Sequence, residues 1–124
     1  MITLGIETSC DECGLALIDW ERRHAWQVLR SQVDLHKVYG GVVPEIAARD
    51  HVEHLPKLLK HLLAESGIAQ DQISNVAYTA GPGLIGALLA GSVFACSYAS
   101  ALRIPAIPVH HLEAHLLIGL MGQS

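Results

Sequence analysis

The stretch from Val76 to Leu102 contains no charged residue, and this constrains the fold more than any other feature of the chain. An uncharged run of that length is long enough to span a bilayer as a helix. Gly81-Pro82-Gly83 interrupts it, however, and its second half carries hydroxyl groups, on Ser92, Ser97, Tyr98 and Ser100. We therefore predict a strand over 75–80, a glycine turn and a buried helix over 84–102, and no membrane span.

The N-terminal part predicts three consecutive antiparallel strands. Over residues 2–7, apolar side chains alternate with Thr3, Gly5 and Glu7, which is typical of a strand. The segment "GLALID" (14–19) is apolar on both faces, as expected of a central strand. A third strand is predicted for "AWQVLRSQ" (25–32).

Helical spacing of apolar residues follows over 45–66, with Pro44 just before it and Gly67 as the stop. Pro56 should kink this helix or split it in two. A strand over 104–109 contains two prolines, which favours an edge position. The last helix is expected to begin near His110. The order β-β-β-α-β-α-β-α predicts the α/β class, with one mixed five-stranded sheet.

Composition indicates one domain with a hydrophobic core, since 51% of residues are hydrophobic and 16% are charged. Eight basic against twelve acidic side chains give a formal charge of −4. This balance offers no electrostatic footprint for nucleic acid, although it leaves RNA contact open. The three cysteines and the absence of a secretory leader favour a reducing compartment.

The segment "HHLEAH" (110–115) places His111 and His115 one helical turn apart on one face. Two imidazoles at that spacing can bind a transition-metal ion, although such a site needs at least one more ligand. The alternative is that they are ordinary polar residues at a helix start. Glu113 lies roughly 200° around the helix from His111. That position argues against the zinc-protease pattern, in which the glutamate directly follows the first histidine.

The turn "ETSCDEC" (7–13) joins two predicted strands and could present backbone N–H groups and the Ser9 hydroxyl to an anion. Its carboxylates, Asp11 and Glu12, could orient a nucleophile or a cation. The alternative is an ordinary polar hairpin. Cys10 and Cys13 have a C-x-x-C spacing, but no second pair accompanies them, so zinc or redox use is not favoured.

The segment "AGPGL" (80–84) follows a strand and opens a helix, where Gly83 could help to hold a phosphate. It lacks the lysine of a P-loop, and a purely structural turn is the alternative. Gly83, Ala87 and Gly91 recur every four residues, which predicts close packing of the helix against a neighbour.

Four ordered motifs together resemble the bacterial TsaD (Gcp) family of tRNA adenosine threonylcarbamoyltransferases. They are "GIETSCDE" (5–12), "YGGVVPEIAARDH" (39–51), "YTAGPGLIGALLAG" (78–91) and "IPVHHLEAHLL" (107–117). The resemblance implies an actin-like, sugar-kinase-like (RNase H-like) fold. It also implies transfer of threonylcarbamoyl from an adenylate to the adenosine beside the tRNA anticodon, in the cytoplasm.

The same resemblance implies site residues and partners. His111 and His115 match the metal-binding histidines of the family, which binds one divalent ion, iron or zinc. Asp11 and Glu12 match acidic residues needed for activity, and Ser9 and Gly83 would contact substrate. The helices of 45–66 and 84–102 would bind a TsaB-like paralogue or a second copy of the chain, and tRNA would bind through the full complex.

Two departures from the family pattern accompany the resemblance. The family usually has threonine in place of Cys13. Its members are also more than twice as long, so residues 1–124 are expected to be a single N-terminal lobe. The second lobe, which would complete the metal site and bind most of the nucleotide, is expected to be absent, and this chain alone is expected to be inactive. The alternatives are a non-catalytic TsaB-like interaction module and a metallopeptidase.

Overall fold

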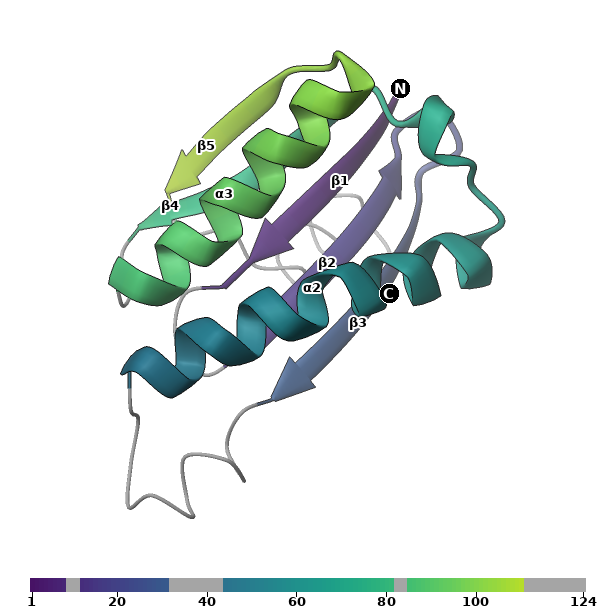
Figure 1. The fold of residues 1–124 in the computed structure, drawn as a ribbon. Coiled ribbons are helices and arrows are strands. Elements are labelled where there is room, and N and C mark those ends of the chain that lie inside the picture. Colours follow the sequence, from purple (N-terminus) through teal and green to yellow (C-terminus); the bar gives the residue numbers. More distant parts are fainter. Residues whose placement is uncertain (9–11, 32–43, 82–84, 111–124) are drawn as a thin grey trace.

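A computed structural model of the chain describes residues 1–8, 12–31, 44–81 and 85–110 (Figure 1). They form a five-stranded sheet in the order β3-β2-β1-β4-β5. The strands are β1 (Ile2–Glu7), β2 (Glu12–Asp19), β3 (His24–Ser31), β4 (Asn75–Gly81) and β5 (Ala106–His110). The helices are α2 (Pro44–Ser66), the short 3-10 helix η1 (Gln70–Gln72) and α3 (Ile85–Leu102).

The predicted α/β class and the mixed five-stranded sheet are confirmed. β1 pairs antiparallel with β2 and parallel with β4, β2 pairs antiparallel with β3, and β4 pairs parallel with β5. The central position of β2 and the edge position of β5 are also confirmed. His110, predicted near the start of the last helix, is instead the final residue of β5. The rest of that predicted helix lies outside the described residues.

Helix α2 is a single helix, so of the two effects predicted for Pro56, a kink or a split, the split does not occur. Pro56 lies on the exposed side of the helix. Water can therefore reach the carbonyl group that loses its backbone partner, which lowers the cost of an internal proline. The predicted stop is confirmed: Gly67 has φ of 74°, and its N–H donates to the Leu63 carbonyl over 3.1 Å.

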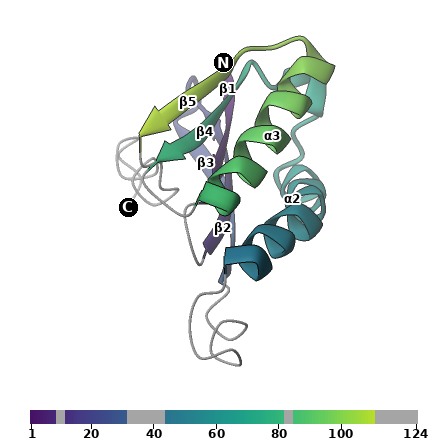
Figure 2. The ribbon, with the colours of Figure 1, turned by 60° about the vertical axis from the view of Figure 1, so that its left-hand side comes forward.

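Both helices pack on the same face of the sheet, as Figure 2 shows with the sheet seen nearly edge-on. On this face α2 contributes leucines and α3 contributes alanines to one hydrophobic core. Its buried members are Leu4, Ile6, Cys13, Leu15, Leu17, Leu55, Leu59, Leu62, Ile73, Val76, Ala95 and Ala99. Because the inward residues of β1 are Leu4 and Ile6, its alternate residues, including Glu7, face the other side of the sheet.

Helix α3 approaches β1 closely through small residues, as predicted from their spacing. Ala87 and Gly91 are buried against the end of β1. The Thr8 hydroxyl donates a hydrogen bond to the Ala87 carbonyl over 2.8 Å. A Cβ atom added to Gly91 would collide with the Thr8 side chain. Any larger residue at position 91 would therefore push α3 away from the sheet.

The opposite side of α3 is exposed, so the prediction of a buried helix is wrong for that side. Ile85, Leu89 and Val93 are 84%, 59% and 56% exposed. By length and composition alone α3 could cross a membrane, and 28% of it is buried here. A core helix that packs through one face passes the same test, so this is weak evidence for a span.

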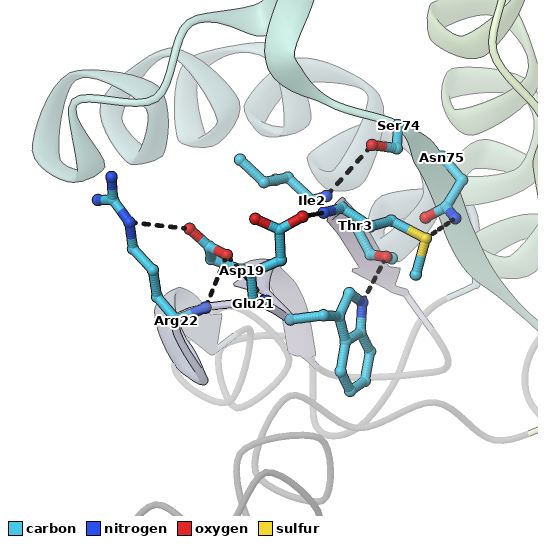
Figure 3. A network of polar contacts seen from close by, with 9 residues as sticks. Ile2, Thr3, Asp19, Glu21, Arg22, Ser74 and Asn75 are labelled. Atoms are coloured by element: carbon cyan, nitrogen blue, oxygen red, sulfur yellow. Dashed lines mark hydrogen bonds and ion pairs between the residues drawn. The ribbon is translucent and has the colours of Figure 1, made fainter.

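A network of polar contacts joins the first residues of β1 to the neighbouring segments (Figure 3). The Trp20 indole N–H donates to the Thr3 hydroxyl over 2.9 Å, and the Ile2 N–H donates to the Ser74 hydroxyl over 3.2 Å. Asp19 Oδ1 accepts the backbone N–H groups of the β2–β3 turn. These bonds close the turn and fix the start of β1.

We expect Gly91→Ala to lower the free energy of unfolding by about 1–3 kcal/mol, because overpacking at the Thr8 contact exceeds the gain in helix propensity. Urea unfolding followed by circular dichroism measures this change.

The Thr8→Ala background provides the control. Removing the Thr8 hydroxyl and methyl groups relieves the collision, so Gly91→Ala should cost at least about 0.5 kcal/mol less there. Equal costs in the two backgrounds would contradict close packing of α3 on β1.

Candidate functional site

Three parallel strands end at one edge of the sheet. β1, β4 and β5 are neighbours that run in the same direction, so their carboxyl ends lie together (Figure 1). β2 runs the opposite way and begins at this same edge. In open α/β sheets, ligands bind beyond the carboxyl ends of the parallel strands. This edge is therefore the candidate site.

The segments that carry the predicted site residues leave from this edge. Ser9 and Asp11 follow β1, Gly83 follows β4, and His111 and His115 follow β5. These five residues lie outside the described residues, so their roles stay predictions. Glu12 is the first residue of β2, where its backbone pairs with that of Ser31 in β3.

Two buried polar residues at the candidate site, Glu7 and Thr79, were missed in the sequence analysis. Glu7 ends β1 and is 7% exposed, and Thr79 of β4 is 1% exposed. The Thr79 hydroxyl donates to Glu7 Oε2 over 2.8 Å. The sequence did contain a signal for Glu7, because it is the only charged residue in the strand of residues 2–7.

The strand next to Glu7 has no side chain at the position opposite it. In the next strand, Gly14 lies opposite Glu7 in register, and Leu29 of β3 lies opposite Gly14. A Cβ atom on Gly14 would lie 2.8 Å from Leu29 Cδ2 and 3.8 Å from the Glu7 Cβ atom. The missing side chain at Gly14 thus leaves room for Leu29, which lies on the same face of the sheet as Glu7.

Cys13 is fully buried in the hydrophobic core on the helix side of β2. A thiol buried in apolar surroundings is poorly placed for exchange or redox chemistry. This agrees with the sequence-based view that the C-x-x-C spacing is not a redox motif. Cys10 lies outside the described residues.

A second cysteine contacts β4 from α3. A hydrogen bond between the Tyr78 hydroxyl and the Cys96 thiol, together with partial burial, raises the pKa of Tyr78 above its ordinary value of 10.0. Burial also raises the pKa of Tyr98. The Tyr78–Cys96 contact helps to dock α3 on the strand that carries Thr79.

Within residues 1–8, 12–31, 44–81 and 85–110, no group of three His, Cys, Asp or Glu side chains could hold a metal ion. The predicted ligands His111 and His115 are not among these residues. The donor chemistry still fits the implied metal, because imidazole nitrogens suit both zinc and iron.

An apolar groove of about 930 Å³ runs between the exposed sides of α2 and α3. Its lining includes Val52, Leu55, Leu89, Ala90, Val93 and Phe94. Arg49 and Glu53 contribute one charge of each sign. Exposed apolar side chains gathered in a groove are typical of a surface that binds another protein.

Comparison with protein families finds a match to TsaD, described as tRNA N6-adenosine threonylcarbamoyltransferase, over residues 25–124. Proteins named tRNA N6-adenosine threonylcarbamoyltransferase from the Corby, Lens and Paris strains of Legionella pneumophila are each 55% identical to this chain over 121 residues. That alignment covers 98% of this chain and 36% of those proteins. The chain thus spans about a third of the length of these relatives.

Solved structures support the fold. YeaZ from Pseudomonas aeruginosa matches with a TM-score of 0.70 and 23% identity, over 90% of this chain and 46% of YeaZ. A crystal structure described as an uncharacterized protein with similarity to peptidase YEAZ, from the same organism, matches with a TM-score of 0.69 and 23% identity, over 90% of this chain and 44% of that one. The described residues therefore have the actin-like, RNase H-like α/β fold that the resemblance implied.

We expect Cys96→Ala to lower the pKa of Tyr78 towards its ordinary value while the pKa of Tyr98 stays raised, since only Tyr78 depends on Cys96. NMR titration with carbon-labelled tyrosine measures both groups. The raised pKa also means that the unfolded chain loses the Tyr78 proton first, so its contribution to stability is complete below pH 10.0 and declines above it.

Cys96→Ser is the matched control, because serine keeps a hydrogen-bonding side chain of similar size. It should leave the pKa of Tyr78 closer to that of the unaltered chain. A Tyr78 pKa that is the same in all three proteins would show that Cys96 has no part in it.

Proposed function

The chain belongs to the TsaD family of tRNA N6-adenosine threonylcarbamoyltransferases, and from this premise we propose that it is the N-terminal lobe of such an enzyme. The enzyme transfers threonylcarbamoyl from threonylcarbamoyl-adenylate to the adenosine next to the tRNA anticodon, in the cytoplasm. The second lobe, expected to complete the metal site and bind most of the nucleotide, is needed for activity.

One observation carries this proposal: identity of 55% over 98% of the chain with proteins of that name. The sheet topology supports it independently. The three segments with predicted site residues follow strands that end at one edge, where α/β proteins bind their ligands. The alternatives have less support. A likeness to YeaZ at 23% identity indicates a shared fold and does not favour a TsaB-like module. The position of Glu113 relative to His111 opposes a metallopeptidase.

The reaction is an acyl transfer at a carbamoyl carbon. The adenosine N6 amine attacks that carbon, the new N–C bond forms, the bond to the phosphate oxygen breaks, and adenosine monophosphate leaves. The amine must also lose a proton. We propose that Asp11 and Glu12 accept this proton and orient the amine. Ser9 and the backbone at Gly83 would hold the phosphate of the adenylate.

His111 and His115 would bind a divalent metal ion, zinc or iron, through their imidazole nitrogens. When bound, such an ion supplies Lewis-acid polarisation of a carbonyl oxygen. Two histidines leave the coordination sphere incomplete, which agrees with the proposal that the second lobe contributes the remaining protein ligand.

A partner interface is the second part of the proposal. The groove between α2 and α3 would bind a TsaB-type protein, the class to which YeaZ belongs. A protein of the same fold has an equivalent pair of helices on one face of its sheet. Two such pairs can pack together, burying Leu89 and Val93 of this chain. Arg49 and Glu53, which also line the groove, give the apolar surface a polar boundary.

The activity test uses a chimaera in which this chain replaces the matching third of the Legionella pneumophila protein. With threonylcarbamoyl-adenylate, tRNA and a TsaB-type protein, we expect it to form threonylcarbamoyladenosine, measured by mass spectrometry of digested tRNA. The chain alone should form none. His111→Ala with His115→Ala should lower the rate at least about 100-fold, because removing metal ligands removes Lewis-acid assistance.

His24→Ala with His61→Ala is the matched control, since both histidines are exposed and lie away from the candidate site. This pair should keep the rate. Calorimetry with Zn²⁺ and anaerobic Fe²⁺ should likewise show weaker binding only for the His111/His115 pair. An inactive chimaera, or equal rates for the two double variants, would contradict the proposal.

Leu89→Glu should weaken binding of the chain to a TsaB-type protein at least about tenfold, because it places a charge in the centre of an apolar interface. Analytical ultracentrifugation with YeaZ from Pseudomonas aeruginosa measures this binding and also reports self-association.

Leu29→Glu is the control of the same residue type. Leu29 is 40% exposed, but it lies on the other face of the sheet. It should leave binding unchanged. Equal binding by the Leu89→Glu variant would exclude the groove as the interface. Self-association that Leu89→Glu abolishes, without binding to YeaZ, would instead assign the groove to a second copy of the chain.

A further inference from the structure

We propose that Glu7 and Thr79 are positioning residues for the transfer reaction: their hydrogen bond holds the carboxyl ends of β1 and β4 together and so fixes the segments that follow them. The catalytic part of this inference rests on the proposed function. The structural part, that the bond orders this edge of the sheet, does not.

The bond lies where the backbone pairing of β1 with β4 ends. That pairing runs from Thr3–Asn75 to Ile6–Tyr78. The next position along both strands is Glu7–Thr79, where the link is made by side chains over 2.8 Å. The side-chain bond therefore extends the connection between the strands by one residue, up to the point where the chain leaves the sheet.

Thr79 is also central to the edge. On its other side it lies in register with Val109 of β5, and the β4–β5 register shifts between Thr79 and Gly81, which pairs with His110. Thr79 is thus flanked by β1, which leads to Ser9, Asp11 and Glu12, and by β5, which leads to His111 and His115. Its own strand leads to Gly83. The bond joins two of the three strands that precede the predicted site segments, and the third strand, β5, pairs with β4 at Thr79.

The chemistry of the pair favours a functional reason for it. Two apolar side chains would pack at these positions without the desolvation cost of burying a carboxylate and a hydroxyl group. On the same face of the sheet, the apolar side chain of Leu29 lies over Gly14, the residue that pairs with Glu7. Residues that do not maximise stability are concentrated at functional sites, where function requires a defined geometry.

Loss of the bond should act on geometry more than on the affinity for substrate. Neither residue is proposed to touch substrate, so KM should change little. Catalytic groups that shift by about 1 Å can lower a rate by about 100-fold. A positioning residue is therefore recognised by a fall in kcat at nearly constant KM.

The first test compares Thr79→Val with Thr3→Val by hydrogen exchange of this chain. Both threonines are buried, face the same side of the sheet and take part in a side-chain hydrogen bond, but Thr3 lies at the other end, bonded to Trp20. Thr79→Val should speed exchange at Thr8, Ala80 and Gly81 at least about tenfold. Thr3→Val should leave exchange at these residues unchanged.

The second test measures kcat and KM in the chimaera. Thr79→Val should lower kcat at least about tenfold with KM within about twofold. Thr79→Ser, which keeps the hydroxyl group, should restore kcat to within about threefold of the original value. Thr3→Val should keep kcat although it lowers the melting temperature to a similar extent.

Each outcome decides one question. Unchanged exchange in Thr79→Val overturns the inference whatever the activity. Faster exchange with unchanged kcat overturns the catalytic part, as does an equal loss of kcat in Thr3→Val. A chimaera that is inactive without any substitution overturns the proposed function and the catalytic part with it, while faster exchange in Thr79→Val would still support the ordering of the edge.

Discussion

The contact between Thr8 and the small residues of α3 is the constraint on which the rest of the structure depends. Gly91 has no side chain where Thr8 lies, and the Thr8 hydroxyl is bonded to the Ala87 carbonyl. This contact brings α3 close to the end of β1. With α3 held there, its exposed side lies next to α2 and forms the apolar groove. One close approach between a helix and a strand thus sets the position of both the candidate site and the candidate interface.

The two ends of β1 are polar in different ways. At the start of the strand, the Trp20–Thr3 and Ile2–Ser74 bonds join loops and strand ends (Figure 3). The first bond ties the β2–β3 turn to β1, and the second ties the residue before β4 to β1. At its end, Glu7 and Thr79 are buried between neighbouring strands, and no turn needs to be closed between them. Three parallel strands finish at that end, and the bond there joins two of them, β1 and β4, just before the chain leaves the sheet.

Much of the fold could be predicted because its signals are local. Alternation in residues 2–7, the apolar run of β2 and the two prolines near β5 each report how one strand is buried. The differences came from tertiary context. Pro56 is exposed and does not split α2, and α3 is uncharged on a side that the described residues do not cover. Glu7 was missed because its importance depends on Thr79, 72 residues away. The predicted ligands and carboxylates were found through motifs, whose geometry a single sequence cannot supply.

The candidate site and the candidate partner surface differ in polarity, and α3 contributes to both. The groove is lined mainly by aliphatic and aromatic groups, which cannot stabilise a phosphate or a developing charge. The sheet edge is suited to this role because its strand ends lead to the segments with the predicted polar site residues. Leu89 and Val93 lie about 200° around α3 from Gly91, so the helix faces the groove with one side and β1 with the other. A substitution at Leu89 should therefore alter association without disturbing Glu7 and Thr79. A larger residue at Gly91 moves the whole helix, and with it both surfaces.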